Sequence, residues 1–180
     1  MAEKGKDAVS LLTADHRKVE GLFEQFEKAS GADKKRRLAE QICTELTIHT
    51  TIEEEIFYPA CKGEIEDDTV FEAFVEHDGA KMLIAEIEAG SPDDQFYDAK
   101  VTVLSEEIKH HVKEEEKRGD GMFAQARKAG LDLEALGARL MERKKQLLEK
   151  ITSEGLPPPV TRTVKGPAPK KGAPPAFASK

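Results

Sequence analysis

The sequence is poor in cysteine, in aromatic residues and in long apolar runs, and each shortage excludes a class of protein. Two cysteines among 180 residues are too few for a disulfide framework. Tryptophan is absent and aromatic residues make up 6%, which disfavours single-strand recognition by stacking. No apolar run approaches the length of about 18 residues that a membrane span needs. The first residues lack the apolar core of a secretion signal, so we expect a cytoplasmic protein without a membrane partner.

Charge is unevenly distributed along the chain. Lys and Arg number 28 against 35 Asp and Glu, and the resulting net charge of −7 argues against a nucleic-acid partner. Residues 156–180, by contrast, hold seven of the nine prolines, five basic residues and no acidic residue. This composition cannot bury enough surface to offset the entropy lost on ordering. We therefore expect a disordered tail, with a tether to an acidic partner or to the body of the protein as the sharper alternative.

Before this tail, apolar residues recur at steps of three and four, which is the helical period. The predicted helices span residues 7–29, 33–61, 68–89, a segment from beyond Pro92 to at least 117, and 131–152. Short loops between long amphipathic helices favour antiparallel neighbours. The sequence thus predicts an all-α fold: an up-down-up-down four-helix bundle over 1–130, an additional amphipathic helix over 131–155, and the tail.

Each of the first four helices places a histidine at a position that its apolar pattern reserves for the core. These histidines are His16, His49, His77 and His111, and two glutamates, Glu53 and Glu115, follow one turn after a histidine. A buried ionised carboxylate is costly unless it is paired or bound to metal. Two divalent cations would turn that cost into coordination bonds. The six inward side chains therefore predict a metal site.

The register of the fourth helix leaves alternatives open. His110 and Glu114 form a second pair with the same spacing, and Glu116 is a further candidate if the helix is locally overwound. We prefer His111 and Glu115 because they continue the apolar stripe of that helix. At about 1.5 Å per residue the sites on the first three helices lie near one level. The fourth helix matches that level only if it begins near Tyr97.

Four segments carry a family resemblance. They are residues 11–16, 45–59, 76–77 and 110–116. In order, spacing and flanking residues they resemble the hemerythrin-like, HHE cation-binding family. The resemblance implies a four-helix bundle that holds two non-haem, carboxylate-bridged iron ions. By the family pattern the metal ligands would be His16, His49, Glu53, His77, His111 and Glu115, with both glutamates bridging.

The chain departs from that family in three places. Hemerythrins proper carry a second histidine on the third helix one turn before His77, where this chain has Ala73, so one iron is expected to be short of a ligand. Many relatives continue the fourth-helix motif with an acidic-Leu-Phe-Pro stretch, which residues 117–123 replace. The fifth helix and the tail lie beyond the matched segments.

Other residues near the motifs have plainer interpretations. Glu54, Glu55 and Glu114 are predicted either to face solvent or to accept hydrogen bonds from metal-bound imidazoles. Tyr58 is predicted to be an ordinary half-buried tyrosine, with a hydrogen bond donated near the site as the alternative. The two cysteines are predicted to be small buried or surface thiols.

Three functional hypotheses follow. The leading one is a di-iron protein that binds metal and a small ligand, namely O2, NO or peroxide, for sensing, storage or iron handling. The open coordination positions of shared nitrogen and oxygen ligands support it. The second is a catalase-like enzyme that decomposes peroxide at the same centre. The third is a protein-interaction module, with self-association through the apolar stripe of the C-terminal helix.

Overall fold

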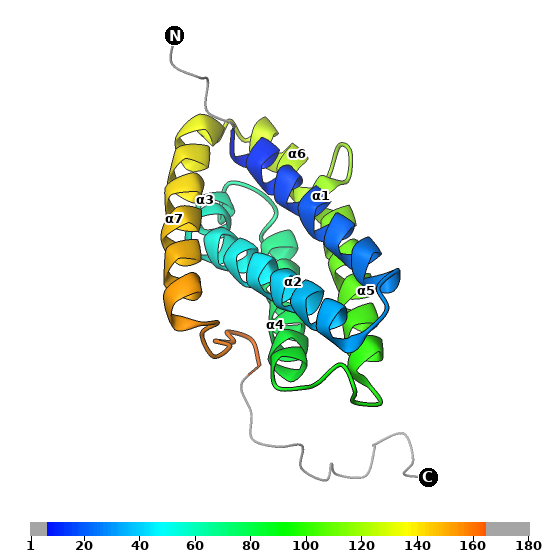
Figure 1. Cartoon of the computed structure of the whole chain (residues 1–180). Coiled ribbons are helices and arrows are strands. Elements are labelled where there is room, and N and C mark those ends of the chain that lie inside the picture. The colour runs from blue at the N-terminus through cyan, green and yellow to red at the C-terminus, as the bar shows by residue number, and fades with distance from the viewer. Residues whose placement is uncertain (1–6, 165–180) are drawn as a thin grey trace, which may run out of the picture.

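The computed structural model describes residues 7–164, which form helices and connecting turns without a strand. Figure 1 shows the arrangement. The elements are α1 (Ala8–Glu27), α2 (Ala32–Ile52), the π-helix η1 (Glu53–Phe57), α3 (Tyr58–Cys61), α4 (Asp67–Glu88), α5 (Tyr97–Glu116), α6 (Met122–Lys128) and α7 (Leu133–Glu154). The predicted all-α fold class is confirmed.

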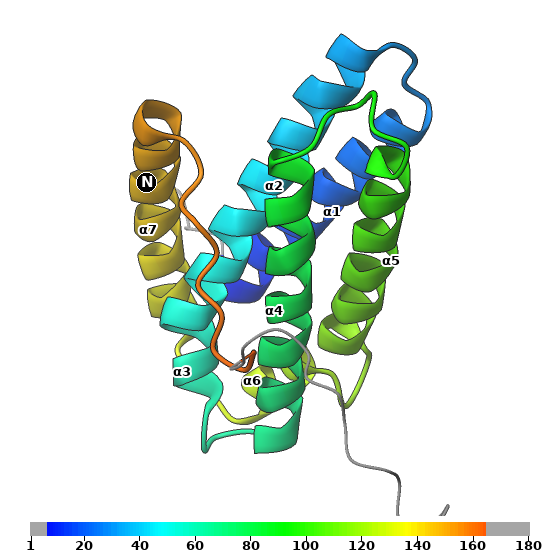
Figure 2. The same cartoon turned by 90° about the horizontal axis from the view of Figure 1, so that it is seen from below.

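The long helices α1, α2, α4 and α5 close into a four-helix bundle. α1 packs against α2 and α5, and α4 packs against the same two helices from the opposite corner. α7 lies outside this ring, where it covers α1 and α2 (Figure 2). In the described part of the chain, no helix combines the length and the apolarity needed to cross a bilayer.

Side-chain caps fix where two helices begin. The carboxylate of Asp7 accepts a hydrogen bond from the backbone N–H of Ser10 at 2.7 Å, and that of Asp132 accepts one from Ala135 at 2.9 Å. These bonds satisfy donors that a helix start leaves unpaired. The fourth bundle helix, α5, begins at Tyr97, as the level of the predicted site required.

One predicted helix is interrupted, and the fourth ends within one residue of position 117, to which it was predicted to reach. The helix predicted over 33–61 is broken by η1, and the region after α5 turns sharply into the separate helix α6. Gly119 sits in this turn with a φ of 94°, a conformation that favours glycine. At Gly121 a Cβ atom would lie 2.6–2.7 Å from backbone oxygens of the last turn of α5. The turn that sends α6 back over the bundle therefore requires a glycine at position 121.

The core consists of two apolar clusters separated by a polar layer. The first cluster includes Phe23, Ile42 and Leu104, and the second includes Leu12 and Leu140. On α1, α2 and α4 the histidines His16, His49 and His77 fall between positions that enter different clusters. On α5 the predicted site residues lie at the end of the stretch that enters the first cluster. The two clusters therefore hold the polar layer from both sides.

α7 uses its apolar stripe within the chain. Leu136, Leu140 and Ile151 are buried, and Leu133 and Leu147 pack against the second cluster. Self-association through this helix stays a prediction. Of the predicted tail, residues 165–180 lie outside the described residues, whereas 156–164 follow an extended path from α7 to α4 (Figure 2).

Candidate metal centre

The six residues predicted from the stripes meet in the polar layer between the two apolar clusters. They come from five segments: His16 from α1, His49 from α2, Glu53 from η1, His77 from α4, and His111 and Glu115 from α5. None of the six residues is more than 5% exposed. A cluster of this composition is compatible with metal binding.

One half of the centre, called the first half here, consists of His16 and His49. Their Nε2 atoms lie 3.0 Å apart. The Nε2 atom of His16 is 3.3 Å from Oε2 of Glu115, and that of His49 is 3.2 Å from Oε2 of Glu53. Each histidine of the first half therefore faces a different glutamate.

The second half consists of His77 and His111, whose Nε2 atoms lie 3.2 Å apart. Oε2 of Glu53 is 3.4 Å from Nε2 of His77, and Oε1 of Glu115 is 3.5 Å from Nε2 of His111. Both glutamates thus reach both halves. Glu115 directs one oxygen to each half, which is the arrangement of a bridging carboxylate.

The geometry of the donors fits metal ions. Nitrogen ligands about 2.1 Å from one ion and at right angles are about 3 Å apart, close to the separation within each histidine pair. Oε1 of Glu53 and Oε2 of Glu115 are buried and have no hydrogen-bond partner among residues 7–164. Buried polar atoms without a partner are rare and call for an explanation. Cations bound between the two halves would supply that missing partner.

Protonation in the centre follows from burial and mutual repulsion. Burial, and then the neighbouring Glu115, raise the pKa of Glu53 well above its usual range. Burial works in the opposite direction on Glu115, yet the surrounding histidines hold the pKa of that carboxyl low. Burial and the charge of His16 lower the pKa of His49 to about 4, and burial also lowers the pKa of His77. Neutral imidazole is the form that binds metal.

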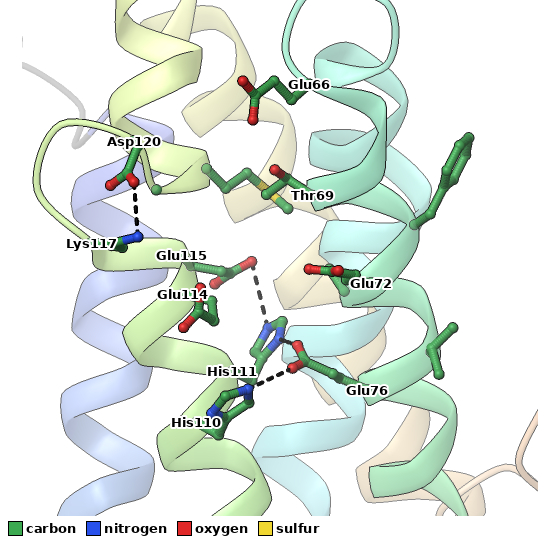
Figure 3. Close-up of a pocket in the computed structure, with 15 residues that line it drawn as sticks. Glu66, Thr69, Glu72, Glu76, His110, His111, Glu114, Glu115, Lys117 and Asp120 are labelled. Carbon is green, nitrogen blue, oxygen red and sulfur yellow. Dashed lines mark hydrogen bonds and ion pairs between the residues drawn. The ribbon is translucent and has the colours of Figure 1, made fainter.

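The outward Nδ1 atom of each histidine faces a further carboxylate. Glu116 lies 2.7 Å from Nδ1 of His16, and Glu54 lies 3.1 Å from that of His77. Glu76 lies 2.7 Å from Nδ1 of His111 (Figure 3). Asp15 is 3.7 Å from Nδ1 of His49, beyond hydrogen-bond distance. The three carboxylates within hydrogen-bond distance hold the rings of His16, His77 and His111 with Nε2 directed inward.

The alternative register of α5 is not the one that faces the centre. His110 is 65% exposed and Glu114 is exposed, so both lie on the outer side of the helix (Figure 3). Glu116 contacts the outward nitrogen of His16 instead of an inward one. The prediction that Glu54 accepts a hydrogen bond from an imidazole agrees with its contact to His77.

Tyr58 belongs to the centre, and predicting it as an ordinary half-buried tyrosine was wrong. Its side chain is fully buried, and its hydroxyl lies 3.0 Å from Oε1 of Glu115 and 3.4 Å from Oε2 of Glu53. The cause is η1, in which the N–H of Tyr58 bonds the carbonyl of Glu53 five residues earlier. In a regular α-helix those residues would point about 140° apart. Such local π-turns are frequent at functional sites.

Phe123 is a second residue that the sequence reasoning missed. The ring of Phe123 stacks on His16 with centroids 5.8 Å apart and an interplanar angle of 7°. It stands in the stretch that departs from the family pattern, and the turn at Gly121 brings it back over the bundle. The first half is therefore covered by an aromatic ring from α6.

The second half borders a cavity of about 610 Å3 between α4 and α5. His111 and Glu115 form part of its wall, and Ala73 lines it one turn before His77. The cavity is also lined by acidic side chains, drawn in Figure 3 with the rest of its lining: Glu66, Glu72, Glu76, Glu114 and Asp120. A negatively lined passage raises the local concentration of cations.

A helical bundle with inward histidines and shared glutamates is typical of proteins that hold metal ions between their helices. The Hemerythrin HHE cation binding domain model matches residues 7–118, and the chain belongs to this family. A crystal structure of a Hemerythrin HHE cation binding domain-containing protein from Mycobacterium kansasii superposes with a TM-score of 0.68. That likeness covers 84% of this chain and 95% of the other at 20% identity, and it shows the fold alone.

A curated relative, a DNA nickase from Nostoc sp. (strain PCC 7120 / SAG 25.82 / UTEX 2576), is 29% identical over 106 residues. The match covers 59% of this chain. The aligned region spans only 30% of the length of that relative.

Proposed function

We propose that this chain binds two iron ions, one in each half, with His16, His49, Glu53, His77, His111 and Glu115 as ligands and both glutamates bridging. One observation carries the proposal: two histidine pairs face the same two buried carboxylates, whose free oxygens have no partner in the described structure. The all nitrogen and oxygen donor set suits iron, and it is the set expected of di-iron carboxylate proteins.

The protein residues have distinct tasks in this proposal. The carboxylates at the outward nitrogens orient the imidazoles. The raised pKa keeps a proton on Glu53, and this proton would be released to solvent if cations were bound. Burial and the two glutamates raise the pKa of Tyr58, so its hydroxyl keeps its proton and donates it in a hydrogen bond to Glu115.

The second half is the proposed place for an external ligand. It lies beside the cavity, and Ala73 leaves it one histidine short of the hemerythrin pattern. Iron bound there would supply an open coordination position for O2, NO or peroxide. The cavity would admit both the cation and the small ligand, in keeping with sensing, storage or iron handling.

The test is metal content measured together with the visible spectrum. Protein loaded anaerobically with ferrous iron and then exposed to air is expected to hold two irons per chain and to absorb near the blue-ultraviolet edge. Glu115→Ala should lose this absorption, because Glu115 faces both halves. Glu106→Ala, on the exposed side of α5 and outside the cavity lining, is the matched control and should keep it. A wild type without stoichiometric iron contradicts the proposal.

A second candidate is peroxide decomposition, in which two peroxide molecules give two waters and one dioxygen. The observation that favours it is the buried Tyr58 hydroxyl beside the second half, close to both bridging glutamates. Rapid peroxide consumption that is lost in Glu53→Ala and slowed in Tyr58→Phe would support it. A loaded protein that binds peroxide without consuming it would overturn it.

We do not extend the activity of the nickase relative to this chain. The passage that reaches the centre is lined by acidic side chains, which repel the phosphates of nucleic acid. The expected result is an unchanged supercoiled plasmid after incubation with iron-loaded protein, and plasmid nicking would contradict it. The interaction-module hypothesis is also less favoured, because α7 already packs its apolar stripe on α1 and α2.

A further inference from the structure

Residues beyond the family match reach back to the second half of the centre. Gly155, with a φ of 85°, ends α7 and redirects the chain. Residues 156–164 then run toward α4 in an extended path (Figure 2). Leu156 packs against the first apolar cluster at the start of this path. The end of the path, residues 160–164, is called the clasp below.

Asp78 on α4 anchors the clasp. Its side chain is buried, and Oδ2 accepts hydrogen bonds from the backbone N–H groups of Arg162 at 2.9 Å, Thr163 at 2.6 Å and Val164 at 3.3 Å. The hydroxyl of Thr163 donates to the same oxygen at 2.7 Å. Hydrogen bonds to an ionised acceptor are among the stronger ones in proteins. Lys81 adds a bond to the carbonyl of Val160 at 3.1 Å.

The anchored clasp delivers Arg162 to Glu54. Nε of Arg162 donates to Oε2 of Glu54 at 3.1 Å, and its guanidinium lies 5.1 Å from the ring centroid of Phe74. The other oxygen of Glu54 accepts from Lys81 at 2.6 Å and faces Nδ1 of His77 at 3.1 Å. An unbroken chain of contacts therefore runs from Arg162 through Glu54 to His77.

We propose that the clasp is a positioning element for the second half, in which Asp78 fixes the clasp, Arg162 fixes Glu54, and Glu54 fixes His77. This deepens the proposed metal-binding function and rests on it. A carboxylate held at the outward nitrogen orients an imidazole and raises its strength as a ligand. Arginine suits the task because its planar head makes directed contacts and stays charged.

The first half has its own support and serves as an internal reference. Lys144 of α7, which also lies beyond the family match, forms an ion pair with Asp15, and Asp15 faces His49. Loss of Arg162 should leave this contact intact. The clasp is therefore expected to affect only one of the two metal positions. A general loss of stability would affect both.

Stepwise binding of ferrous iron to the full-length, metal-free protein under anaerobic calorimetry tests the proposal. Arg162→Ala is expected to weaken one of the two binding steps by about 10–100-fold, the range of outer-shell changes at metal sites, and to leave the other step unchanged. Arg162→Lys should restore part of the loss. Lys100→Ala, which removes an exposed ion pair with Glu86, is the control and should change neither step.

Two histidine variants assign the affected step. In His16→Ala only the second-half step should remain, and adding Arg162→Ala should weaken it. In His111→Ala only the first-half step should remain, and adding Arg162→Ala should leave it unchanged. Equal weakening of both steps, or of neither, would overturn the positioning role.

A measurement without metal tests the anchor. Trypsin cleavage after Arg162, followed by mass spectrometry, is expected to be slow in the wild type and at least about tenfold faster in Asp78→Asn. The reason is that a hydrogen bond to a charged acceptor shifts the equilibrium between the bound and the released clasp by more than a factor of about ten. Equal cleavage would overturn the anchor. If the wild type binds no metal, the proposed function fails. If it binds two ions that Arg162→Ala leaves equally tight, only the positioning role fails.

Discussion

The two halves of the centre use the same kinds of ligand but differ in how they are enclosed. In the first half, Phe123 of α6 stacks on His16 and covers the pair. The second half instead borders the cavity and the hydroxyl of Tyr58. Under the proposed function, this contrast would let the first half retain an ion and the second half expose one to small ligands.

Removal of Glu53 should affect both halves together, because its Oε2 atom lies beside both histidine pairs. Glu53→Ala is expected to weaken both binding steps by more than the 10–100-fold typical of outer-shell changes, roughly beyond 100-fold. Anaerobic calorimetry with ferrous iron measures this. Glu55→Ala, two residues after Glu53, is the control, since it removes only an exposed contact to Arg143. Retention of one tight step in Glu53→Ala would show that Glu53 is not shared.

Opening of the first half gives the next largest effect. Phe123→Ala removes a buried ring that contacts both His16 and Phe57, and we expect a loss of about 3 kcal/mol in the free energy of unfolding. Urea denaturation of the metal-free protein measures it. Removing the exposed Phe96 in the same way should cost far less. A similar cost for both variants would mean that Phe123 does not cover the centre.

The outer carboxylates sharpen the comparison further. Glu116→Gln is expected to weaken only the first-half step and Glu76→Gln only the second-half step, each by about 10–100-fold. The reason is that each carboxylate contacts only one ring of the centre, His16 for Glu116 and His111 for Glu76. Glu72→Gln, in the lining of the same cavity, is the control for Glu76. If either variant shifted both steps alike, the two halves would not be separable.

The smallest expected effect belongs to Tyr58. Tyr58→Phe removes a buried hydroxyl that donates to Glu115, and the metal-free protein should lose about 1 kcal/mol of stability. Any change in iron binding by Tyr58→Phe should be confined to the second-half step. Tyr97→Phe, in the first apolar cluster, is the comparison variant and should leave both binding steps unchanged. A first-half change in Tyr58→Phe would contradict the placement of its hydroxyl.

Much of the fold and of the centre followed from one feature of the sequence. Histidines and glutamates stand at core positions of four otherwise apolar stripes, and helical periodicity alone brings such positions inward. The positions of His16 and His77 needed only the period of their own helices. The same reasoning placed the start of α5 near Tyr97, because the level of His111 required it.

What could not be predicted depends on departures from regular geometry and on long-range contacts. Periodicity assumes one helical repeat throughout, so the π-turn that swings Tyr58 inward was invisible to it. The path of α6 depends on a backbone approach at Gly121, not on a pattern. The order of residues 160–164 comes from hydrogen bonds to Asp78, which composition does not report.

The central claim is that the centre holds two separable metal positions, and iron content per chain tests it most directly. We predict two irons in the wild type, one in His16→Ala and one in His111→Ala. His110→Ala, which alters the exposed neighbour of His111, should retain two. A wild type with a single iron that either His16→Ala or His111→Ala abolishes would contradict the claim, because it would make the six residues one mononuclear site.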